Sequence, residues 1–330
     1  MSQPRVRLMM GPGTLPSQGR DRLDLARYRS SGRPQLTGHQ LLGAVPEIAA
    51  FASVTVDEAN PHGIATLEDL RKLSLRVNEA LARSDVDGVV FVQGTNSIEE
   101  TAYFLNLTVR SAKPLVVTGA QRPFTAMSSD APLNLLDAVR VAAHPGTRGK
   151  GVVVVANGEI NAAREVTKTN TYRLQTFRSR DVGLLGYADP DAIVYYRSPA
   201  RRHTLQSEFD IAAVERLPRV DVIHVSVASQ SGLAEAALGL GAEGLVVAAT
   251  GAGSCGNLDA ELAAIAAERR AVVVRSSRVG EGRVIRDDNW QHPNMVAADN
   301  LPPQKAALLL ALALVRTTDP DEIQRVFEQY

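Results

Sequence analysis

The sequence contains almost no cysteine and no excess of charge of either sign. Cys255 is the only cysteine among 330 residues, which excludes a disulfide within the chain. Lysine and arginine total 36, as do aspartate and glutamate, so the formal net charge at pH 7 is zero. Proteins that bind nucleic acids or membrane surfaces usually carry a basic excess or patch. The charge balance therefore disfavours both kinds of partner.

Long apolar runs and metal-ligand spacings are also missing. The longest apolar stretch, residues 306–315, is too short to span a bilayer and follows two prolines with the pattern of a buried helix. The start of the chain shows no basic segment followed by a long apolar run, the mark of a signal peptide. The six histidines are scattered. We expect a cytoplasmic protein that needs no metal or cofactor.

The most informative stretch is GVVFVQGTNSIEETAYFL, residues 88–105, in which several local signals coincide. The apolar run at 89–92 is typical of a strand buried on both faces, and it ends at Gly94. Ser97, with Glu100 three residues later, has the form of a capping box at the start of a helix. The stretch therefore predicts a strand, a tight turn and a helix.

Hydroxyl and amide side chains follow this strand directly, at Thr95 and Asn96. A turn of this kind places them at the carboxyl end of a central strand, beside helix N–H groups that favour anionic ligands. Taken alone, Gly-Thr-Asn is more often a plain turn. A second unit of the same kind makes a site the better interpretation, because VRLMMGPG at 6–13 is a short strand running through a glycine-rich turn into Thr14.

The rest of the chain alternates strands and helices, which indicates an α/β fold with a mainly parallel sheet in a larger N-terminal domain and a smaller C-terminal α/β domain. We expect the domains at 1–200 and 219–330, with a polar, proline-containing linker at 201–218. Thr66 and Asp69 form a further capping-box pattern. The other expected strands are 53–56, 114–118, 152–155, 191–195, 220–225, 245–249 and 271–274. The expected helices are 38–44, 67–83, 131–143, 233–240, 258–269 and two at the end of the chain.

A competing motif lies at 251–256, where GAGSCG is a literal GxGxxG between a predicted strand and a predicted helix. The next strand carries Arg275 and is followed by Arg278, as in an NADP site. The motif comes late in the chain, and too little sequence follows to supply the remaining strands of a dinucleotide domain. The dinucleotide interpretation is therefore disfavoured.

Taken together, the motifs resemble the bacterial-type L-asparaginase (asparaginase/glutaminase) family, of which this chain looks like a divergent member. The resemblance covers nearly the whole chain in order, which makes it far more specific than any single motif. The segments that carry it are GTNSIEETAYFLNLTV from Gly94, VTGAQRPFTAMSSDAPLNLLDAV from Val117, EVTKTNTYRLQTFRS from Glu165, SPARRHT from Ser198, VVRSSRV from Val273 and PQKAALLLALAL from Pro303.

The resemblance implies hydrolysis of the side-chain amide of L-asparagine, or of a related small amide, to a carboxylate and ammonia. Thr14 matches the family's nucleophile, and Thr95 with Lys168 matches its second threonine and base. A threonine hydroxyl needs such a base, and a lysine can serve only when burial or positive charge depresses its pKa. Gly94 matches the substrate site, where backbone N–H groups near Thr95 would hold the oxyanion. Direct attack by water, with Thr14 as a helper, stays open.

The segment at 15–35 matches the family's lid over the active site, and Tyr28 matches its tyrosine. A tyrosine that only packs a loop against the body is an equal alternative. The resemblance also implies a homotetramer, a dimer of intimate dimers. In that assembly Asn257 matches an asparagine that reaches into a neighbouring subunit's site, and Asp287 or Asp288 aligns loosely with the family's trans-acting glutamate.

Three departures from the family pattern concern how the substrate is held. Asn96 stands where an aspartate usually meets the substrate's α-ammonium. His62 or Gly63, in NPHGIA, falls where a serine usually holds the carboxylate. Pro12, in GPGT instead of TGGT, fixes φ and removes a backbone donor beside the nucleophile. Two alternatives therefore remain: hydrolysis of a modified amide, such as an N-substituted, deaminated or D-configured relative of asparagine, and a non-catalytic amino-acid-binding sensor on the same fold.

Overall fold

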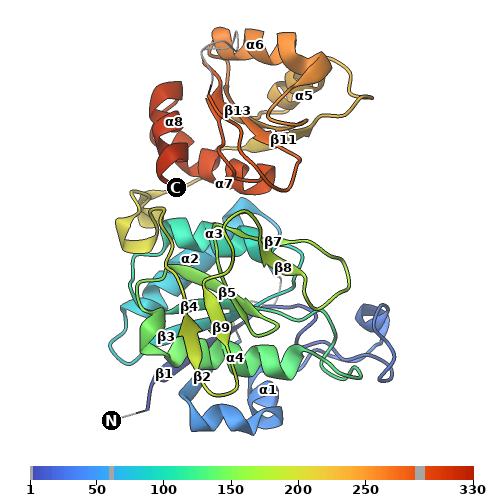
Figure 1. Cartoon of the computed structure of the whole chain (residues 1–330), viewed down its shortest axis with the longest axis vertical. Coiled ribbons are helices and arrows are strands. Elements are labelled where there is room, and N and C mark those ends of the chain that lie inside the picture. The colour runs from blue at the N-terminus through green and yellow to red at the C-terminus, as the bar shows by residue number, and fades with distance from the viewer. Residues whose placement is uncertain (1–2, 59–62, 287–293) are drawn as a thin grey trace. The chain divides into compact units, whose positions relative to one another are not determined.

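The computed structural model describes residues 3–58, 63–286 and 294–330. The chain forms two compact units, Met1–Glu208 and Phe209–Tyr330 (Figure 1). Each unit is built on its own sheet and has its own hydrophobic core. Within these described ranges, no helix has both the length and the apolar character needed to cross a bilayer.

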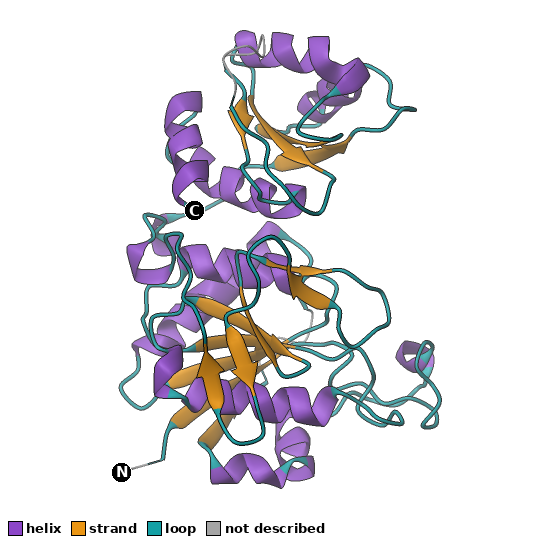
Figure 2. Ribbon diagram, viewed as in Figure 1, coloured by secondary structure: helices purple, strands orange, loops and turns teal. Residues whose placement is uncertain are grey.

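The first unit is built on an eight-stranded sheet with the order β10-β9-β6-β5-β4-β3-β1-β2. The strands of this sheet are drawn in orange in Figure 2. The strands from β2 to β5 are parallel, and β6, β9 and β10 extend the sheet in antiparallel fashion. A separate antiparallel pair is formed by β7 and β8. The bounds are β1 (Arg5–Met10), β2 (Ser53–Asp57), β3 (Gly88–Val92), β4 (Leu115–Thr118), β5 (Val152–Ala156), β6 (Glu159–Ala162), β7 (Val166–Lys168), β8 (Phe177–Ser179), β9 (Gly186–Ala188) and β10 (Ile193–Tyr195).

Helices cover both faces of this sheet, as the continuous apolar strands require. Val90 and Val92 of β3 pack in the cluster that includes α1 (Gly38–Ala44) and α4 (Ala131–Ala143). The alternate residues of the same strand pack in a second cluster, with α2 (Leu67–Ala82) and α3 (Ile98–Thr108). The prediction that β3 is buried on both faces is therefore confirmed, and this burial fixes the strand that carries Thr95.

The predicted capping box of Ser97 and Glu100 at the start of α3 is wrong. Ser97 is the N-cap residue, but its side chain makes no capping hydrogen bond. Its ψ angle is 18°, whereas Thr66, which does form the predicted capping box with Asp69, has a ψ of 163°. Only the extended backbone lets an N-cap hydroxyl reach the N–H three residues on. The tight turn after Thr95 imposes the other conformation on Ser97.

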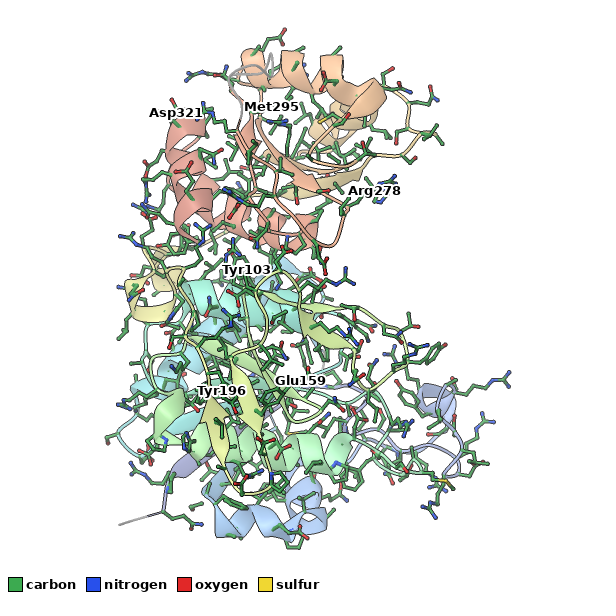
Figure 3. The ribbon with its side chains drawn as sticks, viewed as in Figure 1. Tyr103, Glu159, Tyr196, Arg278, Met295 and Asp321 are labelled. Atoms are coloured by element: carbon green, nitrogen blue, oxygen red, sulfur yellow. The ribbon has the colours of Figure 1, made fainter. Side chains whose placement is uncertain are left out.

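Most of the other predicted elements are present within a few residues of their expected bounds. The expected strand at 191–195 is present as β10, but it pairs antiparallel with β9 at the edge of the sheet and does not continue the parallel alternation. The short strands β6 to β9 were not predicted, because three or four residues carry too little periodicity. Exposed Tyr196, labelled in Figure 3, follows β10. Its ring lies edge-on to the ring of Tyr187 in β9.

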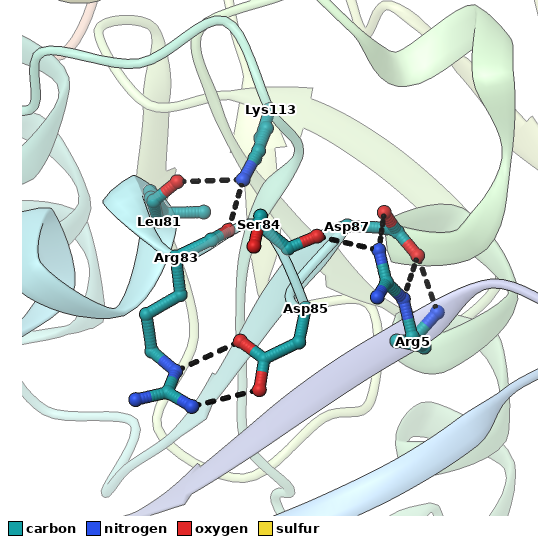
Figure 4. Close-up of polar contacts among 7 residues, drawn as sticks. All are labelled: Arg5, Leu81, Arg83, Ser84, Asp85, Asp87 and Lys113. Atoms are coloured by element: carbon teal, nitrogen blue, oxygen red, sulfur yellow. Dashed lines mark hydrogen bonds and ion pairs between the residues drawn. The ribbon is translucent and has the colours of Figure 1, made fainter.

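The start of β1 is tied to the start of β3 by a bidentate ion pair. The Arg5 guanidinium donates from Nε and Nη2 to the two carboxylate oxygens of Asp87, each at 2.9 Å (Figure 4). These bonds lower the pKa of Asp87 to about 2. Lys113 donates to the carbonyls of Leu81 and Arg83 beside this pair. The contacts fasten β1 against β3 at the end of the sheet away from the two threonine turns.

The second unit carries a four-stranded parallel sheet in the order β11-β12-β13-β14. Apolar residues of α5 and α6 pack on the strands in one cluster, and Leu310 and Leu314 of α7 lie against Gly244 of β12. The bounds are β11 (Val220–His224), β12 (Gly244–Ala249), β13 (Val272–Ser277), β14 (Val296–Ala297), α5 (Leu233–Gly239), α6 (Asp259–Ala267), α7 (Pro303–Leu314) and α8 (Pro320–Gln329). The parallel sheets with flanking helices confirm the predicted fold class.

The GxGxxG stretch forms a tight turn after β12, in which Thr250 pairs with Ser254. Gly253 has a φ of 110°, and a Cβ there would lie 2.8 Å from a methyl group of Val284. Backbone geometry and packing therefore account for this glycine without a ligand. Of the two arginines that suggested a dinucleotide site, Arg275 is buried and only Arg278 is exposed (Figure 3).

Candidate active site

The two threonine turns lie side by side because β1 and β3 are adjacent parallel strands, with Met10 opposite Val92. The Gly94 N–H donates to the Pro12 carbonyl at 2.9 Å, which joins the turns directly. Gly13 packs so closely on the other turn that a Cβ would lie 2.5 Å from the Gly94 nitrogen. Only glycine allows this approach, so the residues before Thr14 bring the two hydroxyl-bearing turns together.

Thr95 is buried and contacts Lys168, which is the last residue of β7. Lys168 Nζ lies 2.6 Å from Thr95 Oγ1, within direct proton-transfer distance. The Lys168 backbone N–H donates to the carboxylate of Glu99 in α3 at 3.0 Å, which positions the end of β7 against that helix. The base and hydroxyl inferred from the sequence are therefore in contact.

The electrostatic surroundings of Lys168 favour its neutral amine. Partial burial lowers the pKa of the Lys168 ammonium, and the nearby Arg29 guanidinium lowers it further. The carboxylate of Glu99 acts in the opposite direction. A lysine in this setting is a better general base near neutral pH than a solvated surface lysine.

Gln121 is a site residue that the sequence analysis did not single out. Its Oε1 accepts a hydrogen bond from Thr95 Oγ1 at 3.1 Å, and its Nε2 donates to the Arg173 carbonyl at 3.2 Å. The Gln121 N–H in turn donates to Asp130 at 2.9 Å. Thr95 is thus held between Lys168 and an anchored amide. The only signal for Gln121 was its place in a family-like segment.

Thr14 is 3% exposed, and its Oγ1 lies 2.8 Å from the hydroxyl of Tyr28. The segment at 15–35 that carries Tyr28 is a loop with one short 3-10 helix, η1 (Tyr28–Ser30). Two hydrogen bonds fasten its first part to the body, from the Phe124 N–H to the Ser17 carbonyl at 2.8 Å and from the Gly19 N–H to Thr125 Oγ1 at 2.9 Å. The loop therefore places a hydroxyl directly on the candidate nucleophile.

The remaining predicted residues divide into three groups. Gly63 lies beside the first turn, where a Cβ would be 3.2 Å from Pro12 Cγ, and Asn96 is exposed in the turn after Thr95. Asn257 belongs to the second unit, in η6 (Gly256–Leu258), and its amide donates to the Ser229 carbonyl at 3.3 Å. His62, Asp287 and Asp288 lie outside the described residues.

Of the backbone N–H groups expected to hold the oxyanion, that of Gly94 and that of Thr95 differ in whether they are free. The Gly94 N–H is already bonded to Pro12, so it is not available to a substrate. The Thr95 N–H has no hydrogen-bond partner in the part of the chain that the structure describes, and it is the better candidate. Gly94 itself lines the cavity beside the turns.

That cavity has a volume of about 310 Å³, and its lining includes Gly13, which precedes Thr14, and Tyr28, which is hydrogen-bonded to Thr14. Its lining is polar and basic, and it holds no carboxylate among the described residues. Within the same ranges, no group of three or more histidine, cysteine, aspartate or glutamate side chains is placed to hold a metal ion. The lining residues are Pro12, Gly13, Ser17, Gln18, Tyr28, Arg29, Arg33, Gln35 and Gly94.

A hydroxyl at a strand end, a second hydroxyl on a lysine of lowered pKa and a small polar cavity together define a candidate hydrolase site of the nucleophile-and-base type. The model of the asparaginase N-terminal domain matches residues 5–201, and that of the glutaminase/asparaginase C-terminal domain matches residues 219–327. The chain therefore belongs to the bacterial-type asparaginase family, and it is an asparaginase-like amidohydrolase.

Individual relatives agree with the family models over nearly the whole length. L-asparaginase 2 of Bacillus subtilis is 39% identical, with 99% of this chain and 87% of the relative covered. A probable periplasmic L-asparaginase of Haemophilus influenzae is 38% identical, with 99% and 93% covered. The crystal structure of a probable cytoplasmic L-asparaginase from Campylobacter jejuni superposes with a TM-score of 0.93 at 34% identity, covering 99% of this chain and all of that one. These matches confirm the predicted family and fold.

Proposed function

We propose that this chain hydrolyses a small carboxamide by a threonine-dependent mechanism. Thr14 Oγ attacks the amide carbon, its proton passes to the base formed by Thr95 and Lys168, and the carbonyl oxygen becomes an oxyanion beside the Thr95 N–H. The C–N bond then breaks and the proton leaves with the amine as ammonia. Water hydrolyses the resulting ester, which restores Thr14 and releases the carboxylate.

The observation that carries this proposal is the 2.6 Å contact between Lys168 Nζ and Thr95 Oγ1. Thr95 is 5% exposed, so little water competes for this hydrogen bond. In the arrangement described, Lys168 donates to Thr95, as expected for the ammonium form. Once Lys168 is neutral, the same contact lets the Thr95 hydroxyl donate to the amine. As Thr95 accepts the Thr14 proton it passes its own proton to Lys168, so the positive charge forms on Lys168 while the negative charge forms on the oxyanion.

The substrate is proposed to be an amide other than free L-asparagine, because Asn96 cannot supply a negative charge to an α-ammonium. Losing a charge-assisted hydrogen bond costs roughly 1.5 to 3 kcal/mol, or about ten- to a hundredfold in kcat/KM. We therefore expect the wild type to be a poor L-asparaginase, with a kcat/KM that Asn96→Asp raises on asparagine. The same change should lower kcat/KM for amides that lack the ammonium, because an unpaired carboxylate is costly to desolvate.

Steady-state ammonia release from asparagine checks this expectation. Gln206→Glu makes the same change of charge at an exposed site on η4 (Thr204–Gln206) and serves as the control. High asparagine activity in the wild type, with no gain in Asn96→Asp, would show that another acid holds the ammonium, Asp288 being the candidate.

The oligomeric state and the compartment are part of the same proposal. By its resemblance to the family, the chain is proposed to form a dimer of intimate dimers in which Asn257 and Asp287 or Asp288 reach a partner's site. A cytoplasmic location is proposed because the similar Campylobacter protein is named a probable cytoplasmic L-asparaginase; the Haemophilus relative is named periplasmic.

We expect an isolated subunit to be inactive, because part of its site would come from the partner. Specific activity measured across a dilution series, with the mass followed by light scattering, tests this expectation. Activity that persists unchanged in samples shown to be monomeric would remove the shared-site proposal. Thr14 and Lys168 would then form a complete site within one chain.

A further inference from the structure

Arg29 occupies a special place in the loop at 15–35. It follows Tyr28 within η1, and the Tyr28 hydroxyl is bonded to Thr14 at 2.8 Å. Arg29 therefore follows the residue that is hydrogen-bonded to the candidate nucleophile, and it lines the same cavity as Gly13 and Tyr28. The hydrogen bond from Tyr28 to Thr14 thus holds the backbone of Arg29 near the reacting hydroxyl.

Two arginines of the loop line the cavity. Arg33 is hydrogen-bonded to a backbone carbonyl of the loop, whereas the Arg29 side chain is exposed. Arg33 Nη2 donates to the Arg20 carbonyl, and Arg20 Nη2 donates to the Ser30 carbonyl, each at 3.0 Å. These bonds cross-link the loop on both sides of η1. No hydrogen bond or ion pair is made by the Arg29 side chain within the described ranges, where it is exposed. Arg29 is thus a guanidinium on a braced loop, ready to meet an anion.

The charge around the cavity has one sign. Two arginines line it, and the described lining residues include no aspartate or glutamate. Asn96, at the end of the neighbouring turn, is neutral. Arg29 is also close enough to Lys168 to lower the pKa of its ammonium, so its field extends over the site of chemistry. A substrate with a free ammonium would be repelled here, whereas a carboxylate would be attracted.

We propose that Arg29 is a specificity residue that binds a carboxylate of the substrate, and that the preferred substrates are monoamides of dicarboxylic acids without a free ammonium. This inference rests on the proposed amide hydrolysis at Thr14 and names the substrate class of that site. The amine is absent or acylated in such compounds, so nothing positive has to approach Arg29 and Arg33. The carboxylate takes the guanidinium while the amide carbon reaches Thr14.

The test compares ammonia release from three amides that share the reacting carboxamide and differ in the charged groups they carry: succinamate, which is asparagine without its amine, L-asparagine, and propionamide, which has neither the carboxylate nor the amine. The wild type is compared with Arg29→Gln and with Arg27→Gln, an exposed arginine of the same loop that does not line the cavity. The ratio of kcat/KM for succinamate to that for propionamide isolates the carboxylate contact. Any effect of Arg29 on Lys168 acts on both substrates and cancels in this ratio.

The wild type is expected to prefer succinamate to both other amides. Arg29→Gln should lower the succinamate-to-propionamide ratio by about ten- to a hundredfold, the scale of a lost charge-assisted hydrogen bond, mainly through KM. Arg27→Gln should leave the ratio unchanged. A preference for asparagine, or a ratio that survives Arg29→Gln, would overturn the inference while leaving amide hydrolysis intact.

Failure of the proposed function gives a different pattern, in which the wild type releases no ammonia from any of the three amides. Calorimetric titration with succinate then decides the inference separately. Saturable binding that weakens in Arg29→Gln and not in Arg27→Gln supports carboxylate recognition by Arg29. If succinate does not bind, or if it binds the wild type and Arg29→Gln equally well, carboxylate recognition by Arg29 is overturned.

Discussion

Replacing Thr14 by alanine is expected to abolish amide hydrolysis and leave a folded protein. The change removes the hydroxyl that follows the turn after β1 and is hydrogen-bonded to Tyr28. Because Thr14 is buried, the lost hydrogen bond and methyl group should cost about 1 to 2 kcal/mol of the free energy of unfolding. Ammonia release and thermal unfolding, measured on the same preparation, check both parts.

The control for this variant is Thr55→Ala, which removes an exposed threonine from the edge strand β2. It should keep full turnover. Wild-type turnover in Thr14→Ala would eliminate Thr14 as the nucleophile. Direct attack by water with Thr14 as a helper would leave a measurable residual rate that rises with pH.

Lys168→Met and Thr95→Val are each expected to lower kcat by roughly a hundredfold or more, the scale of lost general acid/base assistance. If the two side chains form one relay, as their 2.6 Å contact indicates, the double variant should be no slower than the worse single one. Rate losses that multiply would show that they act independently. Lys72→Met, at an exposed position of α2, is the matched control.

The same pair predicts the direction of the pH dependence. The pKa of Lys168 is lowered, so the neutral amine gains population at a lower pH than in a solvated lysine. Activity should rise with pH until this group is deprotonated, and Lys168→Met should lose that limb of the profile. Arg29→Gln removes a positive charge that favours the neutral amine, so it should raise the pKa of Lys168 and move the limb to higher pH.

The turn at Thr95 could be predicted because its signals are local. A run of apolar residues long enough to be a strand and a helical pattern after Gly94 specify strand, turn and helix without knowledge of the neighbours. The placement of Thr14 beside Thr95 needed more, because only the pairing of β1 with β3 brings the two turns together. The family resemblance supplied that information where periodicity could not.

The features that were missed depend on contacts between distant segments. Gln121 has no sequence signal of its own, since its role comes from the hydrogen bond to Thr95 and the anchor on Arg173. The capping box at Ser97 failed because the turn set its ψ angle, which residue types alone do not reveal. The tie between Gly94 and Pro12 likewise shows only in the folded backbone, and it moves the oxyanion role toward Thr95.

The most direct test of the proposed amide hydrolysis is ammonia release by the purified wild type from a panel of small amides: asparagine, glutamine, D-asparagine, succinamate and N-acetylasparagine. Threonine-dependent amide hydrolysis predicts saturable release from at least one member, with one equivalent of carboxylate formed for each ammonia. A folded protein that releases no ammonia from any member, yet binds an amino acid saturably in calorimetry, would contradict it and establish the sensor alternative.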